Sequence, residues 1–298
     1  MSTKLILDTS ALHKALTRHA EISEQKLKKH HPKAVSILEK AGVKPGKIRD
    51  HAAKLAATSA MAAALLFAQP VAQRVFSSAS AKYASLPVDQ LQKLFTQQLN
   101  AILPESMTPL TNEQEQKISS LIKDMWGITA TASLQNERLN RSYGFIGAEQ
   151  HLPRFPGDSI DQHGEPRREG ITPGLGAWGY FAPSKDQLTQ DLIEKEKWYV
   201  AVQTLYLPDW NTRFRYLRDW YQYRKVLVVN PINGKTVVAD VADAGPADWT
   251  GKHFGGSPEV MAYLGLNVGM QKGPVILLFV DESNNPVPLG PVEYNGNK

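Results

Sequence analysis

The sequence predicts an α+β fold, with helices in its N-terminal part and a mostly β domain in its C-terminal half. Residues 85–134 carry apolar side chains at helical spacing, whereas residues 198–280 contain short β-branched and aromatic runs separated by turns. The 298 residues are 42% hydrophobic and 21% charged, which is typical of a folded protein of one or two domains. The chain has no cysteine, which excludes disulfides, thiolate zinc sites and cysteine nucleophiles.

The positive charge is concentrated at the N-terminus. Residues 1–54 hold 12 Lys and Arg against 5 Asp and Glu, a net charge of +7, which leaves −2 for the rest of a chain whose total is +5. We therefore interpret residues 1–54 as a basic cytoplasmic arm and expect no nucleic-acid partner for the remainder.

An uncharged stretch follows this arm. Residues 55–72 contain no charged side chain and are rich in alanine, so residues 55–76 are predicted to be a transmembrane or signal segment. The basic flank lies on its N-terminal side, which by the positive-inside rule places the C-terminal domain outside the cytoplasm. A buried helix of a soluble protein is the alternative.

Two helices are expected in the next part, residues 77–135, which we interpret as a helical spacer. In the first, Leu91, Leu94, Phe95 and Leu99 lie on one face. The second begins at the capping box of Thr111 and Gln114 and ends before Gly127.

Glycine and proline are frequent in the next part of the chain, so residues 136–169 are predicted to be a loop-rich lead-in to a β domain. Strands are expected over residues 198–203, 225–230, 235–242 and 275–280, and the Asn233-Gly234 pair predicts a hairpin turn between the second and the third. A short helix is expected between Ser257, a good N-cap, and Gly265.

The hairpin and its continuation carry a resemblance to a known family. Residues 233–246 read Asn-Gly-Lys-Thr-Val-Val-Ala-Asp-Val-Ala-Asp-Ala-Gly-Pro, and a short helix ending in Leu264-Gly265 and an apolar strand follow. This pattern resembles the double-psi β-barrel of the rare lipoprotein A and expansin-like group. The resemblance implies a six-stranded barrel over residues 170–285, with its first strand at residues 174–181, and a tail at 286–298.

The resemblance also implies an activity. Enzymes of that group are lytic transglycosylases of peptidoglycan, and their acid/base aspartate matches Asp243. A carboxyl at the rim of an apolar barrel has a raised pKa, which suits a general acid. Asp240 is three residues away and is expected on the opposite strand face, as a substrate-binding residue.

The chain departs from the family at two places. Ala244 stands where the family commonly has Arg, and Gly255-Gly256-Ser257 stands where it commonly has Asp-Leu-Ser. The family's second acidic residue has no motif here, and Glu165, Glu169 and Glu194 are unranked candidates. Asp243 before Ala-Gly-Pro also fits an ordinary turn residue.

Aromatic residues are dense between residues 198 and 223, as expected for a glycan groove, although at least half of them are expected in the core. We predict Trp210 and Trp220 to be exposed and to bind substrate with Tyr221, while Arg213 and Arg215 meet carboxylates.

Two functions stay open from the sequence: a peptidoglycan lytic transglycosylase, or a non-catalytic, membrane-tethered module that binds cell-wall glycan. A structural spacer with neither property is a third alternative. No cofactor is expected. His151, His163 and His253 are far apart in sequence, so no metal site is predicted from them.

Overall fold

The computed structural model describes residue 29 and residues 86–164 and 167–294, and every element below belongs to the compact unit Ala72–Lys298. Within the described residues, no helix combines the length and the apolarity needed to cross a membrane. The basic arm at 1–54, apart from residue 29, and the apolar stretch at 55–72 lie outside them.

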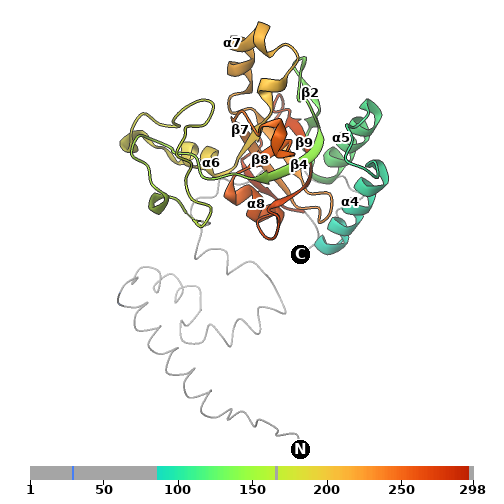
Figure 1. Ribbon diagram of the computed structural model, residues 1–298. Coiled ribbons are helices and arrows are strands. Elements are labelled where there is room, and N and C mark those ends of the chain that lie inside the picture. The colour runs from blue at the N-terminus through green and yellow to red at the C-terminus, as the bar shows by residue number, and fades with distance from the viewer. Residues whose placement is uncertain (1–28, 30–85, 165–166, 295–298) are drawn as a thin grey trace, which may run out of the picture. The chain divides into compact units, whose positions relative to one another are not determined.

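Six strands close into a mixed barrel (Figure 1). They are β4 (Tyr143–Ala148), β5 (Tyr199–Val202), β6 (Lys225–Val229), β7 (Thr236–Asp243), β8 (Phe254–Gly256) and β9 (Lys272–Val280). Going round the barrel, β4 pairs with β8, β8 with β5, β5 with β7, β7 with β6, β6 with β9, and β9 again with β4. The β4–β8 and β5–β7 pairs are parallel and the other four are antiparallel.

The barrel strands are buried on both faces, which explains why their sequences are apolar runs and do not alternate. Inward side chains such as Val228, Val237 and Leu277 form the barrel core. Outward side chains such as Leu227, Val238 and Leu278 pack against two helices, α4 (Val88–Ile102) and α5 (Asn112–Trp126).

These two helices confirm the sequence prediction in detail. Leu91, Phe95 and Leu99 of α4 are buried. The capping box at Thr111 is formed in both directions, and Gly127 ends α5 with a left-handed backbone (φ 70°). Both helices lie along one side of the barrel in Figure 1.

Three further helices surround the barrel. They are α6 (Gln190–Lys197), α7 (Trp210–Tyr221) and α8 (Pro258–Leu264). The last begins at Ser257, whose side chain accepts a hydrogen bond from the Val260 N–H, and ends at Gly265, as predicted. The chain between Tyr206 and Lys225, which was predicted to carry aromatic binding residues, forms α7.

Short elements complete the fold. The small strand β1 (Ala130–Thr131) pairs with β9, and β10 (Gly290–Val292) pairs with β7. β2 (Ser133–Leu134) pairs with β3 (Glu137–Arg138). Single 3-10 turns lie at Ile160–Gln162, Lys185–Gln187, Thr204–Tyr206 and Asp248–Thr250, the last being η5.

The prediction of the first barrel strand is wrong. Residues 174–181 form only a single bridge between Gly176 and Gly179, while the first strand is β4, inside the stretch predicted to be loops. β4 contains Gly144 and Gly147, which weaken its strand pattern, although neighbouring side chains need the space that they leave. The predicted hairpin is confirmed, with Gly234 at a positive φ of 74° between β6 and β7.

Candidate functional site

Asp243 ends β7, where the barrel opens to the loop that follows. A bulge interrupts the pairing with β5, so that Val241 pairs with Val200 but Asp243 pairs with Ala201. The strict alternation of faces therefore does not extend from Asp240 to Asp243.

The Asp243 carboxyl is half-buried and held by the backbone. Its Oδ1 accepts hydrogen bonds from the Ala177 N–H at 2.9 Å and the Ala244 N–H at 2.8 Å. Burial raises the pKa of Asp243, and these two hydrogen bonds lower it by less. Both donors lie on Oδ1, so Oδ2 has no hydrogen-bond donor among the described residues and is the oxygen available for proton transfer.

A second carboxyl, Glu149, lies near Asp243. Burial is the largest influence on the pKa of Glu149 and raises it, Lys252 lowers it, and the charge of Asp243 raises it further. The Lys252 ammonium lies 3.7 Å from Glu149 Oε1 and donates a hydrogen bond to the Ala148 carbonyl at 3.1 Å. Glu149 also lines a surface groove of about 360 Å³ with Gln150, Arg168, Glu169 and Gln271.

Two glycines make room for this ion pair. Gly147 of β4 and Gly255 of β8 pair with each other across the parallel strands. A Cβ on Gly255 would lie 2.6 Å from Glu149 Oε1, and a Cβ on Gly147 would lie 2.4 Å from Lys252 Cε. The Glu149 side chain therefore fills the space over Gly255.

Among the three glutamates predicted as a second acid, only Glu169 lines the groove with Glu149. Glu194 accepts a hydrogen bond from the Trp198 indole, and Glu165 lies outside the described residues. Glu149 was missed because no motif surrounds it, and only the spatial proximity of β4 and β8 reveals it.

The prediction that Trp210 and Trp220 are exposed is wrong. They are 8% and 7% exposed and pack in the barrel core, where Tyr221 also lies. All three belong to α7, whose apolar face covers one end of the barrel, so these rings pack against β-strand side chains instead of forming a glycan surface. The Tyr221 hydroxyl donates to the Arg138 carbonyl.

The other predicted binding residues also differ in setting. Arg213 forms ion pairs with Glu137 and Asp209, whereas Arg215 is exposed on α7. Asp240 is only 1% exposed, and neither of its carboxyl oxygens has a hydrogen-bond partner among the described residues. Burial raises the pKa of Asp240 well above its usual value, and the buried carboxyl is not accessible as a surface ligand.

Two exposed aromatic side chains lie in the segments that follow β7 and β5. Trp249 is 88% exposed in η5, and Tyr206 is 44% exposed beside it, because its hydroxyl accepts a hydrogen bond from the Asp248 N–H at 3.1 Å. The Gln203 amide fixes this loop by donating to the Pro246 carbonyl and Asp248 Oδ1.

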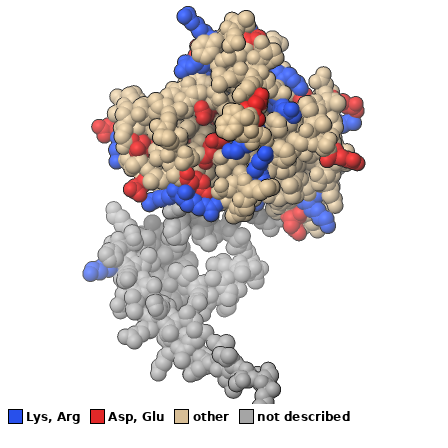
Figure 2. Space-filling model, in the orientation of Figure 1, with Lys and Arg blue, Asp and Glu red and all other residues tan. Residues whose placement is uncertain are grey.

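No protein-family model and no curated protein matches this chain. The architecture that the structure establishes is a six-stranded mixed β-barrel with flanking helices. On the face drawn in Figure 2, acidic and basic side chains are interspersed.

Proposed function

We propose that the barrel acts on peptidoglycan glycan strands as a lytic transglycosylase, with Asp243 as its general acid and base. The observation that carries the proposal is the carboxyl of Asp243 at a barrel rim, buried enough to raise its pKa, with one oxygen free of donors. The resemblance of residues 233–246 to the double-psi barrel group supplies the substrate class, and a double-psi crossing of the strands is part of this proposal.

The proposed reaction balances with one carboxyl. Asp243 Oδ2 gives its proton to the glycosidic oxygen as the bond from the anomeric carbon to that oxygen breaks. The 6-hydroxyl of the same muramoyl residue then forms a bond to the anomeric carbon and returns its proton to Asp243. No water is consumed, and the product is a 1,6-anhydromuramoyl end.

Glu149 takes the place of the family's second acid in this proposal. Its carboxylate occupies the volume above Gly255 and pairs with Lys252, so one carboxylate is supplied from β4 instead of β8. We infer that Glu149 positions the substrate beside Asp243.

A compensating exchange tests this role. Gly255→Ala places a methyl group against Glu149 and is expected to lower product formation, as is Glu149→Ala. The double variant Glu149→Ala/Gly255→Asp restores a carboxylate in the same volume and is expected to recover activity relative to Glu149→Ala. Equal activity of Glu149→Ala and the double variant would contradict the role assigned to Glu149.

The deciding experiment incubates the purified chain with sacculi and searches for 1,6-anhydromuramoyl products by mass spectrometry. Products that are formed by the wild-type chain and lost in Asp243→Asn support the enzymatic function.

The second candidate is a glycan-binding module without catalysis, which Trp249 and Tyr206 favour because sugar rings stack on exposed aromatic faces. Sacculus binding without products would support this second function.

A further inference from the structure

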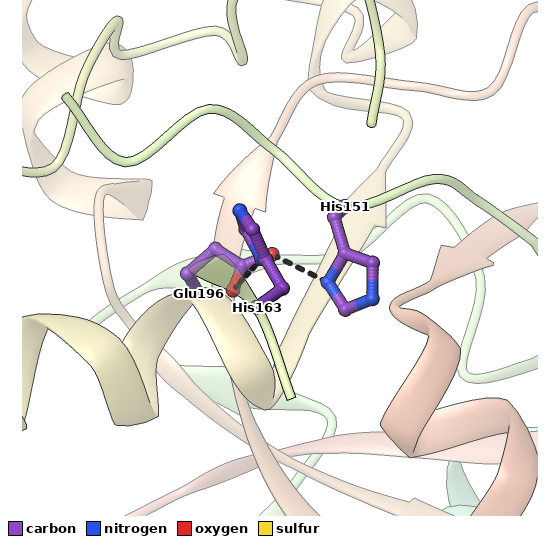
Figure 3. A group of neighbouring side chains, drawn as sticks. All are labelled: His151, His163 and Glu196. Carbon is purple, nitrogen blue, oxygen red and sulfur yellow. Dashed lines mark hydrogen bonds and ion pairs between the residues drawn. The ribbon is translucent and has the colours of Figure 1, made fainter. Parts of the chain in front are cut away.

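Two histidines and a glutamate that are distant in sequence come together behind the candidate site. Figure 3 shows the side chains of His151, His163 and Glu196 grouped together, and the centroids of the two imidazole rings lie 4.6 Å apart. His151 Nδ1 lies 3.1 Å from Glu196 Oε1, and His163 Nδ1 lies 3.3 Å from Glu196 Oε2. All three side chains are buried.

The partner of His163 Nε2 determines whether the other ring nitrogen, Nδ1, carries a proton or a lone pair. His163 Nε2 lies 2.9 Å from Asp158 Oδ2, and the Arg154 guanidinium holds the same carboxylate at 2.9 and 3.1 Å. A neutral His163 that donates from Nε2 presents the lone pair of Nδ1 to the Glu196 carboxylate. Two lone pairs repel each other at 3.3 Å unless a cation lies between them.

A second buried carboxyl, that of Glu259, lies beside this cluster. Glu259 of α8 is 8% exposed, and its Oε2 has no hydrogen-bond partner among the described residues. This oxygen lies 4.0 Å from His151 Nδ1. A buried carboxylate oxygen without a donor requires a compensating cation or proton.

The spacing fits a tetrahedral metal ion. Ligand atoms at about 2.0–2.1 Å from a zinc ion lie about 3.3–3.4 Å from one another. Each histidine Nδ1 lies 3.1 or 3.3 Å from one of the two Glu196 oxygens, and one ligand atom from each of the three residues lies within 4.8 Å of the other two. Asp158 supplies the carboxylate that orients a zinc-bound histidine through its other ring nitrogen.

We propose that His151, His163 and Glu196 bind one divalent transition-metal ion, with zinc as the best match to two nitrogen ligands and one carboxylate ligand, while Glu259 lies beside the site. His151 follows β4, His163 follows the 3-10 turn Ile160–Gln162, Glu196 lies on α6 and Glu259 on α8. Through His151 and His163, the ion would link the long segment between β4 and α6 to the rest of the fold. This site is independent of the proposed glycan chemistry.

The test compares zinc binding by the untagged full chain with that of two ligand variants, His163→Gln and Glu196→Gln. Asp161→Asn is the matched control, because Asp161 is an exposed acid two residues from His163. Five histidines in residues 1–54 also attract zinc, so the difference between chains is decisive and the total content is not.

After removal of metal, zinc added at about 100 times its Kd is expected to raise the Tm of the wild-type chain and the control by about 5–10 °C. The ligand variants are expected to lose this shift and one equivalent of bound zinc. Equal shifts and equal zinc content in all four chains would overturn the proposal.

Cobalt(II) loading of the wild-type chain gives an answer even where a variant fails to fold. We expect the intense visible absorption of four-coordinate cobalt at one equivalent. Only the weak absorption of six-coordinate cobalt would mean that the metal binds at other histidines, and would overturn the site.

Discussion

At the scale of single residues, the two aspartates of β7 illustrate how burial changes chemistry. Asp243 stands at the strand end with two backbone donors, whereas Asp240 lies three residues earlier with none. Both have raised pKa values because of burial, but only Asp243 is accessible. We therefore expect an activity defect from one and a stability effect from the other.

The activity of Asp243 is expected to depend on its proton. Because burial raises the pKa of Asp243, the acid form persists to higher pH, and product formation is expected to fall as the pH rises through that pKa. Asp243→Asn keeps an oxygen for the Ala177 and Ala244 N–H groups and is expected to lower the rate by about 10²–10⁴-fold. The measurements are the pH–rate profile of anhydromuramoyl products and the Tm of the variant, which should stay unchanged. A folded variant with full activity would contradict the catalytic role.

Asp240→Asn is expected to stabilise the protein at neutral and alkaline pH. The folded state binds the Asp240 proton more tightly than the unfolded state, so the free energy of unfolding falls as the pH rises from the unfolded pKa through the folded one. Lys195 and Lys225 reduce this loss, and Asp191 increases it. The amide cannot ionise, so the free energy of unfolding of the variant should exceed that of the wild-type chain by about 1–3 kcal/mol at pH 8. The two free energies should match near pH 3. Thermal unfolding of both chains across this pH range measures the difference, with the exposed Asp186→Asn as the control. A constant difference at all pH values would contradict the explanation.

At the scale of elements, most helices and strands follow from local patterns, and the failures have physical causes. Capping residues and apolar spacing predict α4, α5 and α8 because these signals depend on neighbours in sequence. β4 was missed because its glycines leave space for the side chains of Lys252 and His253, which precede β8. α7 was missed because its dense aromatic residues also fit an exposed glycan groove. The cluster at His151 depends on tertiary contacts between three segments, which no local pattern encodes.

The η5 loop is expected to provide sugar affinity. Trp249→Ala removes an aromatic face that is 88% exposed, and we expect sacculus binding to weaken by about 1–2 kcal/mol, or about 5- to 30-fold. Phe214→Ala is the control, since Phe214 is an exposed aromatic residue on α7. Binding isotherms with soluble glycan fragments measure both. Equal weakening by the two variants would exclude a specific role for η5.

At the scale of the whole molecule, the charge asymmetry predicts topology. Residues 1–54 carry a net +7 before an uncharged stretch, so we expect the N-terminus in the cytoplasm and the barrel outside. Protease added to spheroplasts is expected to digest the barrel and spare an epitope at residue 1. Protection of the barrel, with digestion only after lysis, would place it inside and contradict a function on the cell wall.

The barrel closes through its last strand. β9 pairs with β4 along Tyr143–Gly147 and with β6 along Val226–Val229, so one strand near the C-terminus completes hydrogen bonding on both sides. The β4–β9 pairing joins residues about 130 positions apart, as in Tyr143 with Ile276. During synthesis, the ribosome must therefore release the chain through β9 before the barrel can close. A premature stop codon between β8 and β9 would leave the β9-facing edges of β4 and β6 unpaired, and such an open sheet exposes its backbone hydrogen-bonding groups to proteases and to other chains.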